Sequence, residues 1–225
     1  MCPFNWCCNW WPQWLPKYNE GSKSMNIKLI GNKTSPFVRK VEIVLQELGL
    51  SYDFLLDSPW EPNSQVVKLN PIGKIPVIVI NEEIALFDSS VITDFLLEKI
   101  PSDSLRGLEG INEKLFIRVV HDTLDTAVLC SWELKRAEGK IDSGVLEKYK
   151  KRISSCLQYI DGFYSVEKAQ FSISDIAMVC CIDYLLLRQF FYIVEDDYPN
   201  LFNRRKNLYE RESVKITSPI SLDFK

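Results

Sequence analysis

The sequence contains a single histidine, His121, and its seven cysteines show no paired spacing. A Ser-His-Asp triad or a histidine-rich metal site would have to be built from that one residue, so we expect no metal and predict that His121 lies on a helix face. The cysteines lack metal-site or disulfide spacing, which predicts reduced thiols in a cytoplasmic protein. These shortages disfavour triad hydrolases, zinc enzymes and disulfide-stabilised domains.

The sequence also has no large excess of positive or negative charge, with 27 Lys and Arg residues against 30 Asp and Glu residues. A formal net charge of -3 argues against a nucleic-acid partner. The short basic cluster Arg204-Arg205-Lys206 is predicted to be a solvated helix face. What the chain does have is a hydrophobic content of 46% and a charged content of 25% in 225 residues, which predicts a globular protein with one large domain or two small ones.

Residues 1–24 differ in composition from the rest, with four tryptophans, three cysteines and three prolines. They show no cationic start and no small-residue cleavage site, so they do not form a recognisable signal peptide. The segment is too short and too polar to span a membrane, and we expect no membrane partner. An interfacial tryptophan anchor would need a helical periodicity that is absent. We therefore predict an unstructured extension, with Met25 as the natural start.

The segment Thr34–Lys40 lies between a strand pattern, Asn26–Gly31, and an amphipathic helix pattern that stops before Gly49. Ser35 suits the N-cap and Pro36 the first helical position. The free N–H groups and positive dipole end of this helix favour an anion. A thiol placed there would ionise more readily, and Ser35 could donate a hydrogen bond to it. The alternative is that Ser35 only caps the helix.

A second strand, Ser51–Leu56, completes a βαβ unit with two parallel strands, and a short helix follows over Ser64–Leu69. The next strand, Ile75–Ile80, contains a proline near its beginning, where a ladder donor is lost. A cis Ile75-Pro76 bond would resolve this conflict, because it turns the Ile75 backbone outward to pair with an extended ligand. A trans-proline at a strand start is the alternative.

A returning strand, Ile84–Phe87, leads into a helix that Asp88 and Ser89 open and that has Pro101 at its end. Both residues are plausible caps. The N–H groups at this helix start would equally hold a ligand carboxylate, with the Ser89 hydroxyl adding a bond and the Asp88 carboxylate available for an ammonium. The residues alone favour capping.

Residues 102–110 are polar and rich in turn formers, which predicts a linker. No strand pattern follows, so residues 111–225 are predicted to form an all-helical domain. Ser172 and Asp175 have the spacing of a capping box, before a helix that is apolar nearly all round and should lie at the centre of a bundle. The remaining predictions are helices over Ile111–Glu138 with Gly139 at its end, Val145–Tyr164 and from Pro199 onward, and an irregular tail after Ser213.

The element order βαβαββα followed by helices, together with Thr34–Lys40, Asn70–Val77 and Asp88-Ser89, resembles the cytosolic glutathione transferase family. The resemblance covers everything after Met25 and is nearest to the bacterial branch that begins its first helix with Thr-Ser-Pro-Phe-Val-Arg-Lys. It implies a thioredoxin-like α/β domain over residues 25–101 with a mixed four-stranded sheet. The linker and an all-α bundle domain would follow.

The resemblance also implies roles for single residues. Ser35, with Thr34 as the alternative, would stabilise the glutathione thiolate. Ile75 would pair with the main chain of the glutathione cysteinyl unit, next to a cis Pro76. The other implied roles are a γ-glutamyl clamp at Asp88 and Ser89, further glutathione contacts at Phe37 and Lys74, and an electrophile pocket wall at Leu129, Trp132 and Arg136.

Three functions remain open. The resemblance implies a detoxifying transferase that uses glutathione as co-substrate, forms a homodimer and attacks small hydrophobic electrophiles or peroxides. A non-catalytic binding or regulatory module with the same fold is the alternative if Asp88-Ser89 is only a helix cap. A glutathione-dependent thiol oxidoreductase is the third function, and it is disfavoured. Such enzymes place cysteine where Ser35 stands here, and sometimes also where Val38 stands, and a hydroxyl cannot form a mixed disulfide.

Overall fold

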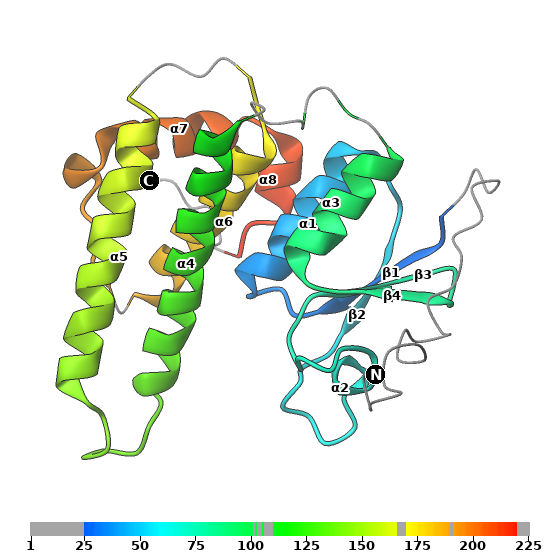
Figure 1. Ribbon diagram of the computed structural model, residues 1–225, viewed down its shortest axis with the longest axis horizontal. Coiled ribbons are helices and arrows are strands. Elements are labelled where there is room, and N and C mark those ends of the chain that lie inside the picture. The colour runs from blue at the N-terminus through cyan, green and yellow to red at the C-terminus, as the bar shows by residue number, and fades with distance from the viewer. Residues whose placement is uncertain are drawn as a thin grey trace, which may run out of the picture.

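The computed structural model describes residues 25–219 apart from 101, 103, 104, 106–109, 166–169 and 190. A small sheet with helices on both faces lies beside a group of longer helices (Figure 1). The predicted extension, residues 1–24, and most of the predicted linker, residues 102–110, fall outside the described residues.

The first domain contains a mixed four-stranded sheet in the order β2-β1-β3-β4. Strand β1 runs parallel to β2 and antiparallel to β3, and β3 pairs antiparallel with β4. This arrangement confirms the predicted parallel βαβ unit and the thioredoxin-like sheet. The strands are β1 (Ile27–Gly31), β2 (Asp53–Leu56), β3 (Val77–Ile80) and β4 (Ile84–Leu86).

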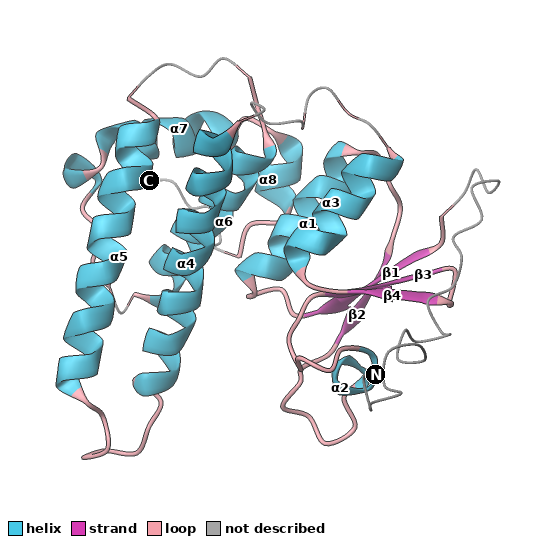
Figure 2. Ribbon diagram, viewed as in Figure 1, coloured by secondary structure: helices cyan, strands magenta, loops and turns pink. Residues whose placement is uncertain are grey.

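Alternation of side chains along the strands explains why helices cover both faces of the sheet (Figure 2). Leu29 and Ile78 join the main core, whereas Ile30 and Val77 pack with Val66 in a smaller cluster on the other face. Each face therefore buries its own apolar row. The helices of this domain are α1 (Pro36–Glu47), α2 (Gln65–Leu69) and α3 (Ser89–Lys99).

The second domain is helical throughout its described residues, as predicted. At its centre, α6 begins with the predicted capping box, in which Ser172 and Asp175 each bond the other's backbone. Nearly every residue in its first three turns is buried. The helices are α4 (Ile111–Glu133), α5 (Ser143–Phe163), α6 (Ile173–Arg188), α7 (Pro199–Leu208) and α8 (Glu212–Ile216), with a 3-10 turn at Glu195–Asp197.

Two helix ends differ from the prediction by three residues or more, whereas α5 begins two residues earlier than predicted. Helix α4 stops at Glu133, and Gly139 lies in the turn beyond it with a φ of 79°. The tail after Ser213 is not irregular, because α8 continues to Ile216. A five-residue helix is not stable alone, so α8 depends on its contacts with the first domain, among them the bonds of Arg211 and Ser213 to Glu47.

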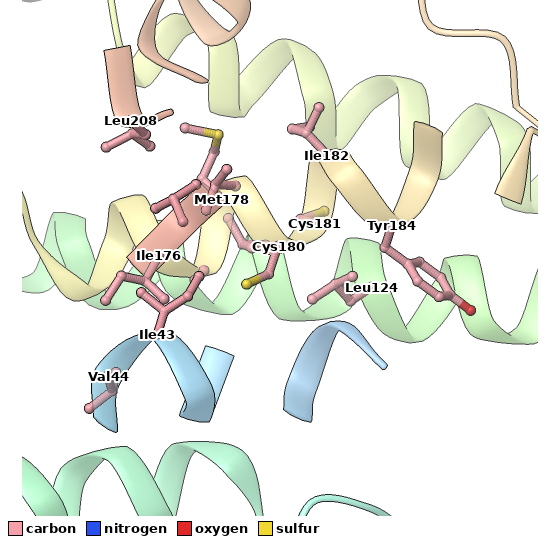
Figure 3. Packing of buried hydrophobic residues seen from close by; sticks show 14 of the residues in the cluster. Ile43, Val44, Leu124, Ile176, Met178, Cys180, Cys181, Ile182, Tyr184 and Leu208 are labelled. Atoms are coloured by element: carbon pink, nitrogen blue, oxygen red, sulfur yellow. The ribbon is translucent and has the colours of Figure 1, made fainter. Parts of the chain in front are cut away.

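Helix α1 lies between the sheet and the second domain. Figure 3 shows Ile43 of α1 next to Ile176 of α6, within one continuous core. The charged side chains Arg39, Lys40 and Glu42 of α1 are 1 to 3% exposed. The polar side of this amphipathic helix therefore faces protein and not solvent, and each charge needs a partner within the fold.

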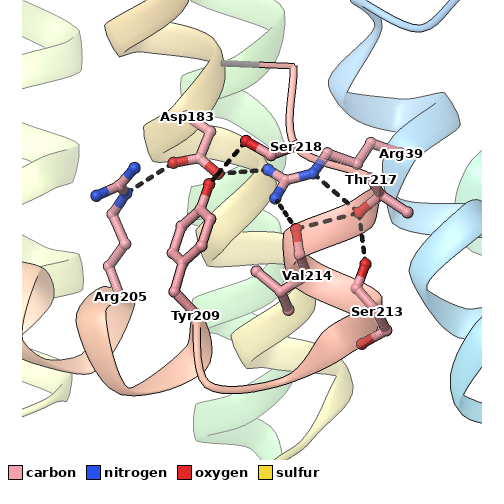
Figure 4. Close-up of polar contacts among 8 residues, drawn as sticks. All are labelled: Arg39, Asp183, Arg205, Tyr209, Ser213, Val214, Thr217 and Ser218. Carbon is pink, nitrogen blue, oxygen red and sulfur yellow. Dashed lines mark hydrogen bonds and ion pairs between the residues drawn. The ribbon is translucent and has the colours of Figure 1, made fainter. Parts of the chain in front are cut away.

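One such partner is Asp183 of α6, which lies between two arginines (Figure 4). Its Oδ2 is 2.5 Å from Arg39 Nη1 and its Oδ1 is 2.6 Å from Arg205 Nε, while Tyr209 donates its hydroxyl to Oδ2. Arg39 also donates to the carbonyl oxygen of Val214 in α8, at 3.1 Å. This cluster binds α1 to the second domain through charges that water does not reach.

The prediction for the basic cluster is wrong for two of its three residues. Arg205 is buried against Asp183, and Arg204 donates from Nη2 to Asp175 Oδ2 at 2.8 Å. Only Lys206 is exposed. Arg204 and Arg205 do not form a solvated face because two carboxylates of α6, Asp175 and Asp183, bind them.

Candidate functional site

Ser35 is the N-cap of α1, as predicted. Its backbone is extended, and its Oγ accepts a hydrogen bond from the Val38 N–H at 3.3 Å. Pro36 occupies the first helical position. Because the Ser35 oxygen acts as acceptor, its own O–H hydrogen can be donated, and it bonds to no acceptor among the described residues. The start of α1 therefore presents a hydroxyl donor at the positive end of a helix.

The neighbouring hydroxyl of Thr34 is already engaged. Thr34 Oγ1 donates to Asn32 Oδ1 at 3.1 Å, and the Thr34 N–H donates to the same oxygen at 3.2 Å. This local ring fixes the turn before α1. Of the two candidates for the thiolate contact, Ser35 has the available hydrogen and Thr34 does not.

A close approach between β1 and α1 holds this turn in place. A Cβ atom added to Gly31 would lie 2.5 Å from Val38 Cγ2, so a larger residue would push the helix away from the strand. Val38 is also the residue whose N–H bonds Ser35. The packing at Gly31 therefore determines where the Ser35 hydroxyl lies relative to the sheet.

Ile75 lies just before β3, and the Ile75-Pro76 bond is cis, as predicted. The pairing of β1 with β3 ends at Ile30 and Val77, so Ile75 takes no part in that ladder. Its backbone is therefore placed at the edge where an extended chain could pair with it.

Asn70 organises the turn that leads to Ile75, and this role was not predicted from the sequence. The Asn70 side chain is buried; its Nδ2 donates to the Lys74 carbonyl at 2.7 Å and its Oδ1 accepts from the Ile72 N–H at 2.9 Å. An asparagine before a proline is a turn signal, but the signal does not specify these partners. The Lys74 side chain itself is exposed.

Asp88 is the N-cap of α3. Its Oδ1 accepts from the N–H groups of Ser90 at 2.9 Å and Val91 at 3.3 Å. Ser89, the first residue of α3, is buried. The capping alternative is therefore confirmed for Asp88. Two of the N–H groups that were expected to face a ligand carboxylate are already bonded.

Lys40 and His121, from different domains, meet beside this helix start. The Lys40 Nζ is 3.3 Å from His121 Nε2 and 3.4 Å from Ser90 Oγ. Burial, and then the charge of Lys40, lowers the pKa of His121 to about 4, so the imidazole is neutral near pH 7. The ring of Phe37 packs edge-on against His121, with 6.2 Å between centroids. His121 does lie on a helix, as predicted, but no sequence signal linked it to Lys40.

The three predicted wall residues lie at the C-terminal end of α4 and just beyond it. Leu129 and Trp132 are exposed, and Trp132 packs edge-on against Trp60 from the loop after β2, with 5.8 Å between centroids. Trp132 thus joins the two domains. Arg136 lies in the turn after α4, and its Nη1 is 3.2 Å from Glu133 Oε2.

Metal ligands do not cluster in the part of the chain that the structure describes, where no group of three or more His, Cys, Asp or Glu residues could hold an ion. None of the described helices is long and apolar enough to cross a membrane. The described cysteines have free thiols, in agreement with the prediction: Cys130, Cys156, Cys180 and Cys181.

Comparison with known proteins finds similarity to glutathione S-transferases. Residues 34–99 match the family described as glutathione S-transferase, N-terminal domain. The Escherichia coli (strain K12) protein named "Uncharacterized GST-like protein YibF" is 29% identical over 199 residues, which is 86% of this chain and 98% of that protein. The similarity thus extends through both domains.

Two solved structures are similar over nearly the same span. A glutathione S-transferase from Methylobacillus flagellatus KT, crystallised with glutathione bound, is 31% identical with a TM-score of 0.80, covering 87% of this chain and all of that one (100%). A glutathione transferase family member from Pseudomonas fluorescens Pf-5, also with bound glutathione, is 26% identical with a TM-score of 0.77, and the coverage is again 87% and 100%.

Proposed function

This chain belongs to the glutathione transferase family, and from that membership we propose that it binds glutathione and activates the thiolate for attack on small electrophiles or peroxides. We also propose that it belongs to the bacterial branch of the family, on the basis of the Thr34–Lys40 motif, and that it is cytoplasmic, which its free thiols support. The observation that carries the proposal is the Ser35 hydroxyl, which has a hydrogen to donate at the positive end of α1.

The chemistry depends on that position. A free thiol has a pKa of about 8.5, and a helix N-terminus with a hydroxyl donor lowers it. The thiol proton passes to water. The thiolate sulfur then forms a bond to an electrophilic carbon, while the leaving group departs with the electrons of its own bond. Ser35 stabilises the sulfur before the attack, and Thr34 has no comparable donor because its hydroxyl bonds Asn32.

The remaining contacts orient the tripeptide. In the proposal, the Ile75 backbone pairs with the cysteinyl main chain, supported by the turn that Asn70 holds. The start of α3 receives the γ-glutamyl end, through Asp88 and Ser89. Phe37 and Lys74 add glutathione contacts. The electrophile lies against α4, where Leu129, Trp132 and Arg136 form the wall; Leu129 and Trp132 are large, exposed apolar side chains suited to a hydrophobic substrate.

We also propose a homodimer. Large apolar side chains on α3 and α4, namely Val91, Ile111 and Leu115, are 51%, 68% and 48% exposed, and a second copy would cover them. Sedimentation equilibrium should give twice the chain mass of 26.1 kDa. Leu115→Glu should shift the protein toward the single-chain mass, whereas Ile216→Glu, at an exposed apolar position on α8, should not. A single-chain mass for the unaltered protein would contradict the dimer.

One observation favours the non-catalytic alternative. The Asp88 carboxylate is engaged in capping α3, as expected if this helix start serves the fold alone. The two functions differ in the step after binding. A binding module would form a stoichiometric complex with a protein partner and would turn over no electrophile.

The proposed function is tested by titrating the protein with glutathione in a calorimeter and recording thiolate absorbance against pH. We expect saturable binding, a pKa for the bound thiol below the free value of about 8.5, and conjugation of an aryl halide. Binding with an unshifted thiol pKa and no turnover would favour the binding module. No binding by calorimetry and no retention on immobilised glutathione would overturn the transferase and the thiol oxidoreductase, the two functions that need glutathione.

A further inference from the structure

Lys40 is a buried cation at the junction of the two domains, and the proposed thiolate chemistry gives it no role. Its side chain is 3% exposed, and its Nζ lies 3.4 Å from Ser90 Oγ of α3 and 3.3 Å from His121 Nε2 of α4. An ammonium has three N–H donors and no acceptor, so Nε2 must accept the bond. The third donor has no partner among the described residues.

Neither contact supplies negative charge. His121 is neutral near pH 7, and the buried thiol of Cys180 in α6, with a pKa of about 12, is neutral as well. Asp88 and Asp94 act on the ammonium through space, but no described carboxylate lies within ion-pair distance of it. Burial lowers the pKa of Lys40 to about 8, so the side chain is still charged near pH 7 while lacking a direct counter-ion.

The start of α3, next to Lys40, has few free N–H donors for a ligand carboxylate. The N–H groups of Ser90 and Val91 bond Asp88, so fewer donors face a ligand than at an uncapped helix start. The charge of Asp88 also repels a second carboxylate. A carboxylate bound at this helix start therefore requires a nearby cation, and among the described residues Lys40 is the cation in contact with Ser90.

We propose that Lys40 is the counter-ion for a ligand carboxylate bound at the start of α3. The inference rests on the proposed function, under which that group is the α-carboxylate of the γ-glutamyl unit of glutathione. His121 orients the ammonium toward Ser90, and Asp88 faces the ligand's amino group, so opposite charges match both ends of a zwitterion. Lys40 and Ser35 belong to the same helix, which fixes the distance between the carboxylate site and the sulfur site.

The test compares two ligands that cannot form a thiolate: S-methylglutathione and its analogue with the γ-glutamyl α-carboxylate replaced by a carboxamide. Lys40→Met should weaken binding of S-methylglutathione by about tenfold, the loss expected for a charge-assisted contact, and leave the carboxamide nearly unaffected. Lys40→Arg keeps the charge and should retain most of the affinity for the carboxylate ligand. Lys114→Met, at an exposed position of α4, should change neither affinity.

Equal losses for both ligands, or no loss for either, would overturn the counter-ion role while leaving glutathione binding intact. If the unaltered protein binds neither ligand, the proposed function fails and this inference fails with it. A second measurement does not depend on the folding of a variant. In the unaltered protein with isotope-labelled lysine, NMR should show the pKa of Lys40 rising by about one unit with S-methylglutathione. Proton binding and ligand binding affect each other equally, so this rise corresponds to the roughly tenfold effect of the Lys40 charge on ligand affinity. No rise, or an equal rise with the carboxamide, would refute the proposal.

Discussion

Replacing Ser35 with alanine is expected to lower the glutathione-dependent kcat by about 100-fold, a loss typical of removing one preorganised donor beside a reacting anion. The hydroxyl is the group at the start of α1 with a hydrogen to donate, and its oxygen is held by the Val38 N–H. The pKa of the bound glutathione thiol should rise toward its free value in the variant. Steady-state kinetics and the pH dependence of thiolate absorbance measure both effects.

Controls separate catalysis from helix capping. Serine to alanine at an N-cap costs about 1 kcal/mol of stability, whereas glycine at that position costs only a few tenths. Ser35→Gly should therefore lose the same activity as Ser35→Ala while remaining closer in stability to the unaltered protein. Thr34→Val should retain activity, because the Thr34 hydroxyl donates to Asn32. Full activity in both Ser35 variants, or a larger loss at Thr34, would contradict the assignment.

Asp183→Asn is expected to lower the free energy of unfolding by about 3 to 5 kcal/mol, the range for breaking a buried ion pair by removing one partner. The carboxylate is fully buried and contacts both Arg39 and Arg205 (Figure 4). Asparagine keeps the shape but not the charge, so two buried guanidinium groups lose their counter-ion. Urea unfolding followed by far-ultraviolet circular dichroism measures the change.

The matched control is Asp197→Asn, which removes the same charge from an exposed 3-10 turn. Surface changes of this kind alter stability by about 0.5 kcal/mol or less. A loss below about 1 kcal/mol for Asp183→Asn would show that the cluster of Arg39, Asp183 and Tyr209 adds little to the attachment of α1.

Local patterns predicted much of the fold and several candidate site positions, because those features depend on neighbouring residues. Ser35 caps α1 and Asp88 caps α3 through bonds that span three residues or fewer. The apolar patterns of residues 26–31 and 75–80 predicted strands β1 and β3, but they did not predict that both faces of the sheet are buried. The capping box at Ser172 located the start of α6 for the same reason.

Other features had no local signal. The side chain of Asn70 selects its partners only after the turn has formed. The short helix α8 has too few residues to be stable by propensity, and contacts with α1 stabilise it. The end of α4 was predicted too late, since helical periodicity continues past Glu133 although the chain has to turn back there toward α5.

By itself, the sequence determined the order of the strands and of the longer helices, and the residues that cap α1, α3 and α6. Tertiary structure decided the environment of the charged residues. Arg39 meets Asp183 across 144 residues of sequence and Lys40 meets His121 across 81. The cost of burying a charge depends on partners that only the folded chain brings together, so an identical helical pattern could place these side chains in water or in the core.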